Sequence, residues 1–304
     1  MTIASIDIGT NTVLLLVGTI GTDGRIGVLH DSVQAPRLGQ GVDAARRLAP
    51  ASIIRVLRVL SEYRSIMEPF HPDLTIVAAT SAVRDAQNRQ EFIERVREAM
   101  GWDVRVLSGN EEAEWTFAGT VSGSSQPGSA LVVDIGGGST EISIGTGLRP
   151  SFHTSIDIGA VRLTERLLPS TPPRPEELAA ARAEIVAQLA AIPADTFTNG
   201  IAYAVAGTPT TLAAHCAGLR TFDRSVVDGY ELSRNAVEGT LRHLASLTPA
   251  EIRKLGSHFE GREDVITAGA LILSQVMDHF GLERIRVSVR GLRYGALLAA
   301  ATAR

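Results

Sequence analysis

Two segments of the chain are nearly alike, and each follows an apolar run that favours a β-strand. They are DIGTNT at residues 7–12 and DIGGGST at residues 134–140. Apolar residues also continue after each segment, so each one predicts a β-hairpin with a small, glycine-bearing turn at its tip. Successive backbone N–H groups of such a turn converge on one concavity. That concavity binds phosphate oxygens without a large side chain.

The repeat carries more weight than either turn alone, because a single glycine turn is most often only a turn. The aspartates that precede the two turns, Asp7 and Asp134, are 134 − 7 = 127 residues apart. This offset predicts two similar halves that face one another across a cleft. Both aspartates can also reach a metal ion, which a bound polyphosphate needs for charge neutralisation.

Strands alternate with helices in both halves, which predicts an α/β protein with mixed sheets. In the first half we expect helices over 50–67, 89–100 and 111–121 and strands over 75–79 and 104–107. In the second half we expect strands over 130–134, 151–155 and 202–206, a helix over 176–192 and a short amphipathic helix over 290–300.

The stretch SGSSQPGS at residues 122–129 is typical of a linker. We therefore divide the chain into an N-terminal domain over residues 1–124 and a C-terminal domain over 125–304. We expect that the last helix, about residues 290–304, can pack back on the N-terminal domain. The 304 residues are long enough for two domains of ordinary size.

Composition excludes several classes of protein. The net charge of −4 argues against nucleic-acid binding, and the apolar runs are too short to span a membrane. The only cysteine, Cys216, excludes an intrachain disulfide and favours a cytoplasmic protein. The only lysine, Lys254, is followed by leucine, so no Walker P-loop is present.

Four carboxylates lie on or near the two predicted turns: Asp7, Asp134, Glu141 and Glu112. Carboxylates beside a phosphate repel it unless they hold a cation or accept a proton from water, and both tasks belong to phosphoryl transfer. Glu112 lies outside the turns and is the better candidate for a base that orients water. The alternative is a glutamate that favours the helix dipole, a role that suits the adjacent Glu111 better.

Arginine and a third backbone site complete the candidate set. Arg84 follows a predicted strand, at the edge where open α/β sheets bind ligands, and Arg37 lies in PRLGQG near the first turn. A helix that begins at Gly207 and Thr208 offers free N–H groups to phosphate. We assign most other arginines to solvated helix faces, namely Arg46, Arg47, Arg55, Arg58 and Arg97.

Six motifs resemble those of the exopolyphosphatase/guanosine pentaphosphate phosphohydrolase family, in family order and over nearly the whole chain. They are DIGTNT, ATSAVRDAQN, SGNEEAE, DIGGGSTE, AGTPTTLA and RGLRYGAL. The resemblance implies two ribonuclease-H-like domains of the actin, sugar kinase and chaperone ATPase superfamily, with an inter-domain cleft. It also implies Mg²⁺-assisted hydrolysis of terminal phosphoanhydrides, with Mn²⁺ as an alternative metal.

The resemblance also implies roles for individual residues. Glu112 resembles the catalytic base, Arg84 a ligand of the reacting phosphate, and Asp134 and Glu141 the residues that bind Mg²⁺ and the attacking water. Asp7 is a further candidate metal ligand. The candidate phosphate and substrate contacts are Thr10, Asn11, Arg37, Gly136, Gly137, Gly138, Ser139, Gly207, Thr208 and, more distally, Arg262.

The sequence thus predicts an exopolyphosphatase that releases orthophosphate from inorganic polyphosphate, and the resemblance suggests a homodimer. Hydrolysis of the 5′-phosphate of guanosine pentaphosphate (pppGpp) is the nearest alternative, because the scissile bond is of the same kind. An ATP-using kinase of the same superfamily would need an adenosine pocket that we do not find in the sequence. A non-catalytic phosphate or nucleotide sensor is the alternative outside enzymes.

Overall fold

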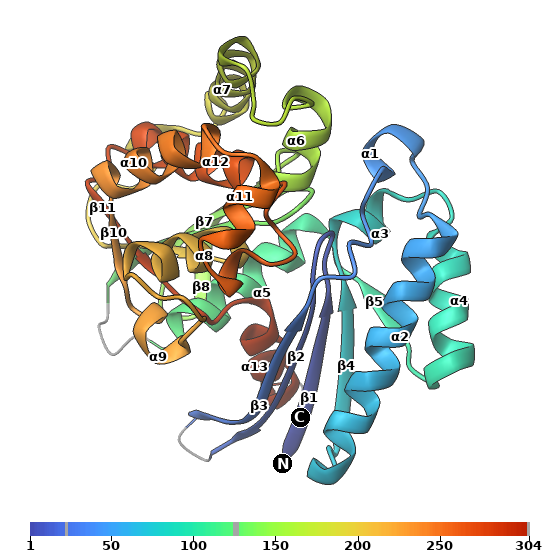
Figure 1. Cartoon of the computed structure of the whole chain (residues 1–304). Coiled ribbons are helices and arrows are strands. Elements are labelled where there is room, and N and C mark those ends of the chain that lie inside the picture. The colour runs from blue at the N-terminus through green and yellow to red at the C-terminus, as the bar shows by residue number, and fades with distance from the viewer. Residues whose placement is uncertain (22–23, 124–127, 303–304) are drawn as a thin grey trace. The chain divides into compact units, whose positions relative to one another are not determined.

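The computed structural model describes residues 1–21, 24–123 and 128–302 (Figure 1). The chain divides into two compact units. The first unit consists of Met1–Ser124 together with Arg290–Arg304, and the second unit is Ser125–Val289. The expected linker over residues 122–129 spans the boundary between the units, and its residues 124–127 lie outside the described residues.

The first unit contains a five-stranded sheet in the order β3-β2-β1-β4-β5. The strands are β1 (Thr2–Ile8), β2 (Val13–Ile20), β3 (Ile26–Gln34), β4 (Leu74–Ala79) and β5 (Val104–Val106). β1, β2 and β3 form an antiparallel meander, whereas β4 runs parallel to β1 and β5 parallel to β4. The carboxyl ends of β1, β4 and β5 therefore share one edge of the sheet. Open α/β sheets bind their ligands at such an edge.

The helices of the first unit are α1 (Val42–Ala45), α2 (Pro50–Met67), η1 (Glu68–Phe70), α3 (Ser81–Asp85), α4 (Arg89–Met100), α5 (Gly109–Val121) and α13 (Leu292–Thr302). Proline at the first position of α2 suits a helix start, because its missing N–H has no partner there in any case. The buried residues of this helix, among them Ile53, Val56, Leu60 and Tyr63, recur at helical spacing. They give α2 one apolar face and place it in the hydrophobic core of the unit.

The last helix, α13, crosses α5 at very close range. A Cβ atom on Gly295 would lie 1.8 Å from the carbonyl oxygen of Trp115, and one on Gly119 would lie 2.0 Å from that of Gly291. Only glycine permits such an approach of two backbones. The expected packing of the last helix on the N-terminal domain is what the structure shows, so the second unit ends at Val289 and not at residue 304.

The second unit contains a six-stranded sheet in the order β10-β11-β9-β6-β7-β8. The strands are β6 (Ser129–Ile135), β7 (Thr140–Thr146), β8 (Arg149–Ile156), β9 (Ile201–Val205), β10 (Glu231–Ser233) and β11 (Arg284–Val287). β6, β7 and β8 are antiparallel to their neighbours, and β9 and β11 continue the sheet in the direction of β6. The antiparallel edge strand β10 has no counterpart in the first unit.

The two sheets repeat one another with the offset that the sequence predicts. Asp7 pairs with Leu14 in the first hairpin, and Asp134 with Glu141 in the second, so that both members are shifted by 127 residues. The parallel pair β1–β4 repeats in β6–β9 with the same shift. Each unit therefore has the strand order and directions of a ribonuclease-H-like domain, which confirms the predicted fold class. The cleft between the domains stays a prediction.

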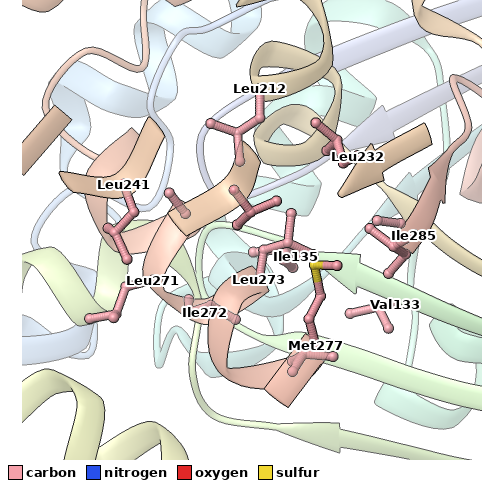
Figure 2. Close-up of a cluster of buried hydrophobic side chains, with 14 of the residues drawn as sticks. Val133, Ile135, Leu212, Leu232, Leu241, Leu271, Ile272, Leu273, Met277 and Ile285 are labelled. Carbon is pink, nitrogen blue, oxygen red and sulfur yellow. The ribbon is translucent and has the colours of Figure 1, made fainter. Parts of the chain in front are cut away.

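The second unit has more helices than the first among the described residues. They are α6 (Ala160–Leu167), α7 (Pro175–Leu189), η2 (Ala194–Thr196), α8 (Gly207–Cys216), α9 (Arg224–Val227), α10 (Arg234–Ala245), α11 (Pro249–Lys254), η3 (Ser257–Phe259) and α12 (Ile266–His279). Figure 2 shows Leu271, Ile272, Leu273 and Met277 of α12 among the buried side chains of this core. α12 is buried on nearly every side, which explains its almost continuous apolar sequence. No helix within the described ranges is long and apolar enough to cross a membrane.

Candidate active site

The first glycine turn connects β1 to β2 and follows Asp7, which is mostly buried. A hydrogen bond from the Gly9 N–H to the Thr12 carbonyl oxygen closes the turn at 2.9 Å. Thr10 is held twice: its hydroxyl oxygen lies 2.8 Å from that of Ser81, and its carbonyl oxygen accepts the N–H of Gly39 at 2.8 Å. The Ser81 hydroxyl was not among the predicted residues, although Ser81 belongs to the motif ATSAVRDAQN. It ties the turn to the first residue of α3.

A loop after β3 lies on the first turn and carries Arg37, which adopts a left-handed backbone with φ 56°. The Arg37 N–H donates to the Asn11 carbonyl oxygen at 3.0 Å. Arg55 on α2 holds the loop from the other side: its Nε donates to the Pro36 carbonyl oxygen at 2.7 Å, and its Nη2 to the Arg37 carbonyl oxygen at 3.3 Å. The assignment of Arg55 to a solvated face is therefore wrong. Arg55 positions the segment that carries Arg37.

Arg84 and Glu112, the predicted phosphate ligand and the predicted base, are in direct contact. Arg84 Nη1 donates to Glu112 Oε2 at 2.8 Å and to the Leu107 carbonyl oxygen at 3.0 Å. The Glu112 side chain is 9% exposed and that of Arg84 is 23% exposed. A charge-assisted bond in this setting fixes both side chains. The contact joins the start of α5 to α3, at the carboxyl end of β4.

The adjacent Glu111 has a different task, as the sequence suggests. The Ser108 side chain accepts the Glu111 N–H, and Glu111 Oε2 accepts the Ser108 N–H at 2.9 Å, which forms a capping box at the start of α5. Bonds from the Ser108 N–H and from Arg105 lower the pKa of Glu111 to about 2. Glu111 thus satisfies the helix terminus, and Glu112 contacts Arg84 instead.

The second glycine turn connects β6 to β7 and is closed like the first, by a bond from the Gly136 N–H to the Ser139 carbonyl oxygen at 3.0 Å. Two N–H groups at the start of α6 donate to the carbonyl oxygens of Gly136 and Gly137, at 2.9 and 2.8 Å. Gly159 permits this approach, because a Cβ atom there would lie 2.4 Å from the Gly137 carbonyl carbon. Within the described ranges, the N–H groups of Gly137 and Gly138 donate to no protein acceptor. They are available to an anion.

Asp134 and Glu141 stand directly opposite one another on β6 and β7. Opposite residues project from the same face of a sheet, with Cβ atoms about 5 Å apart. Glu141 is buried, and its Oε1 accepts the Ser155 hydroxyl at 2.7 Å. The residue that corresponds to Glu141 in the first unit is Leu14, opposite Asp7. The structure therefore brings two carboxylates together in the second unit and leaves Asp7 in the other unit.

The first turn of α8 supplies the third candidate phosphate contact. Ala206, just before the helix, has φ 75° and ψ −167°, a conformation that only glycine adopts without strain. The Thr208 side chain packs against α12, because a Cβ atom on Gly269 would lie 2.2 Å from Thr208 Oγ1. Thr208 can therefore offer a ligand its N–H, as Gly207 can, but not a freely rotating hydroxyl.

Arg262 lies against this same helix turn. Its Nη1 donates to the Gly207 carbonyl oxygen at 3.2 Å and to Thr211 Oγ1 at 3.1 Å. A Cβ atom on Gly207 would lie 2.9 Å from the guanidinium carbon, so glycine is needed at that position. Arg262 thus fixes the start of α8, and its predicted role as a distal substrate contact stays a prediction.

The donor set of the second unit fits Mg²⁺ or Mn²⁺. Mg²⁺ takes one or two protein carboxylates and keeps several waters and substrate phosphates, which matches the facing pair Asp134 and Glu141. Two carboxylates at this separation repel one another unless a cation or a proton lies between them. Over the residues that the structure describes, no three His, Cys, Asp or Glu side chains converge as a closed zinc site requires.

Comparison with known proteins identifies the family. The sequence model described as the Ppx/GppA phosphatase family matches residues 19–303. The exopolyphosphatase 2 of Mycobacterium tuberculosis is 33% identical over 98% of this chain and 98% of its own length. The chain belongs to the Ppx/GppA phosphatase family. The resemblance that the six motifs indicate is thereby confirmed.

Solved Ppx/GppA structures share the fold over the whole chain. The Aquifex aeolicus family member has 30% identity and a TM-score of 0.83, and the match covers 100% of this chain and 98% of that one. An exopolyphosphatase from Cytophaga hutchinsonii has 26% identity and a TM-score of 0.91, with 100% and 98% covered.

The candidate residues of this Ppx/GppA phosphatase divide between the two units. The first unit carries Asp7, Thr10, Asn11, Arg37, Arg84 and Glu112, and the second carries Asp134, Gly136, Gly137, Gly138, Ser139, Glu141, Gly207, Thr208 and Arg262. Within their own units, Arg84 meets Glu112 and Asp134 faces Glu141. The roles of these residues in the reaction stay predictions.

Proposed function

We propose that this protein is an exopolyphosphatase, which hydrolyses the terminal phosphoanhydride of inorganic polyphosphate and releases orthophosphate. The observation that carries the proposal is the contact between Arg84 and Glu112. It combines a carboxylate that can accept a proton with a cation that can bind a phosphoryl group. The names of the relatives in Mycobacterium tuberculosis and Cytophaga hutchinsonii, both exopolyphosphatases, support the substrate.

Glu112 acts as the general base in this proposal. The adjacent Arg84 favours the ionised carboxylate, because an opposite charge stabilises the charged form. Glu112 takes a proton from water as the water oxygen attacks the terminal phosphorus. The bond from that phosphorus to the bridging oxygen breaks, and the shortened polyphosphate leaves with the electron pair. Arg84 has further guanidinium donors besides Nη1, and these can bind the equatorial phosphate oxygens.

The second unit supplies the remaining parts of the proposed mechanism. Asp134 and Glu141 would hold the divalent cation, which neutralises phosphate charge when bound. The N–H groups of Gly137 and Gly138, together with the start of α8, would hold phosphate oxygens by hydrogen bonds. These donors are fixed by α6 and Arg262, so they need no rearrangement as charge develops.

Orthophosphate release tests the proposal most directly. Tripolyphosphate, long polyphosphate, pppGpp and ATP would be compared with Mg²⁺ at equal concentrations of phosphate ends. Faster release from polyphosphate than from pppGpp supports the exopolyphosphatase. Faster release from pppGpp would replace it by the pppGpp phosphohydrolase, and no release from any of the four would favour a sensor. A cytoplasmic location and a homodimer stay expectations, which fractionation and light scattering would test.

A further inference from the structure

Two adjacent arginines in the loop between α1 and α2 have no task in the proposed mechanism. Arg46 is the C-cap residue of α1, and Arg47 follows it in the loop. Both are exposed. In the part of the chain that the structure describes, neither guanidinium forms an ion pair or a hydrogen bond with another side chain. Their positive charges are therefore available to a ligand.

The loop is fixed close to Arg84 by hydrogen bonds. The Gln87 N–H donates to the Arg46 carbonyl oxygen at 2.8 Å. The side chain of Asn88 then binds Leu48 twice, accepting its N–H at 2.8 Å and donating to its carbonyl oxygen at 3.1 Å. Gln87 is only three residues after Arg84, and Figure 1 shows α1 beside α3 in the first unit. Arg46 is thus held near the arginine of the proposed reacting phosphate.

The backbone of Arg46 indicates that its side chain is what the position requires. Arg46 has φ 53°, which is left-handed. Glycine or asparagine is usual at such a helix end, and another residue costs about 1 kcal/mol there. The chain does use glycine at a left-handed helix end elsewhere in the unit, at Gly101 with φ 70°. An arginine that is kept against a backbone preference points to a function of the guanidinium.

We propose that Arg46 and Arg47 bind the inner phosphates of a polyphosphate chain whose terminal phosphate lies at Arg84. Arg89, exposed at the start of α4 and also without an ion pair in the described ranges, extends the same basic surface. This inference rests on the proposed function. The acidic residues nearby in sequence, Asp43 and Asp85, reduce the positive charge of this surface but leave it cationic.

The chemistry of the ligand suits these residues. Each inner phosphate carries a negative charge and two non-bridging oxygens, which the planar guanidinium binds with two parallel hydrogen bonds. The contacts lie away from the scissile bond, so only a chain of several phosphates can make them. They therefore select long polyphosphate over short polyphosphate without taking part in the chemical step.

The substitution Arg46→Gly separates this role from a structural one. Glycine relieves the left-handed backbone, so the unfolding temperature should stay equal or rise. Binding would be measured in the Glu112→Gln background with Mg²⁺, where turnover is slow, by titration with tripolyphosphate and with long polyphosphate. We expect the Kd for long polyphosphate to rise about tenfold, which corresponds to one lost charged contact. The Kd for tripolyphosphate should rise less than threefold, and added salt should reduce the difference.

Two matched variants control for backbone and for charge. His71→Gly changes another exposed, left-handed residue of the first unit, with φ 43°, after η1. Arg64→Ala removes an exposed arginine from the other end of α2. Both should keep the wild-type ratio of the two Kd values. A similar change in Arg64→Ala would show that net charge alone is responsible and would overturn the inference.

The outcomes distinguish the inference from the function on which it rests. If the otherwise wild-type protein hydrolyses polyphosphate but Arg46→Gly binds long chains as tightly as its parent, the inference fails and the function stands. If the wild-type protein hydrolyses none of the substrates but Arg46→Gly loses long-chain binding, the polyphosphate site stands and the catalytic function fails.

Discussion

Glu112→Gln is the substitution that tests the proposed base most sharply. Glutamine keeps the size of the side chain and an oxygen that can accept the Arg84 hydrogen bond, but it cannot take a proton from water. General base catalysis typically contributes about 100-fold to 10,000-fold. We therefore expect kcat to fall at least about 100-fold, equivalent to about 2.7 kcal/mol of barrier, while the KM for polyphosphate changes little.

The structure also sets the expected effect of Glu112→Gln on stability. The contact with Arg84 is a 2.8 Å charged hydrogen bond to a mostly buried carboxylate. Charged hydrogen bonds contribute about 1.5–3 kcal/mol and neutral ones about 0.5–1.5 kcal/mol, so the variant should lose about 1–2 kcal/mol. At about 2–4 °C per kcal/mol, the unfolding temperature should fall by roughly 2–8 °C. The variant should therefore remain folded at 25 °C, and a thermal melt beside the phosphate-release assay would establish this.

Glu111→Gln is the matched control, because it makes the same change one residue earlier on α5. Glutamine still completes the capping box, so only the ion pair with Arg105 is lost and kcat should stay within about twofold. A kcat for Glu112→Gln within threefold of wild type would refute the assignment of Glu112 as the base. Equal losses in the two variants would instead assign the effect to distortion of the start of α5.

Three further predictions concern the surroundings of the candidate site. Excess EDTA should stop turnover if Asp134 and Glu141 hold a divalent metal, Mg²⁺ should restore it, and full activity in EDTA would remove the metal from the mechanism. Ala206→Gly should raise stability by about 1 kcal/mol, because glycine relieves φ 75°; a lower unfolding temperature would contradict the strain. Arg55→Met should raise the KM for polyphosphate about tenfold through displacement of Arg37, whereas Arg58→Met on the same helix should not; equal KM values in both variants would show that the loop does not need Arg55.

The elements that sequence reasoning could predict are those determined by local chemistry. The two hairpins, their offset of 127 residues and the different tasks of Glu111 and Glu112 follow from turn residues, strand periodicity and the capping box around Ser108. The predicted helices over 50–67 and 89–100 match α2 and α4 in both bounds. The predicted helix over 111–121 begins two residues earlier in the structure, because Ser108 caps it.

The contacts that sequence reasoning missed join segments far apart in the chain. Ser81 meets Thr10 across 71 residues, and Arg55 reaches Pro36 across 19. An arginine on an amphipathic helix gives no sign of such a partner, because its position is equally typical of a solvated face. The pairing of Glu141 with Asp134 depends on strand register, but the sequence does not show that Leu14 takes the matching place in the other unit.

The crossing of α13 over α5 has a consequence for biosynthesis. The second unit is continuous in sequence, so a ribosome delivers all of it before the helix that completes the first unit. The first unit, despite containing the N-terminus, therefore matures last, which reverses the usual order of folding during synthesis. Until then the glycine surface of α5 that receives α13 is uncovered. Nascent chains paused before residue 290 should consequently show protease resistance in the second unit before the first, and should lack hydrolytic activity because the helix that bears Glu112 is not yet braced.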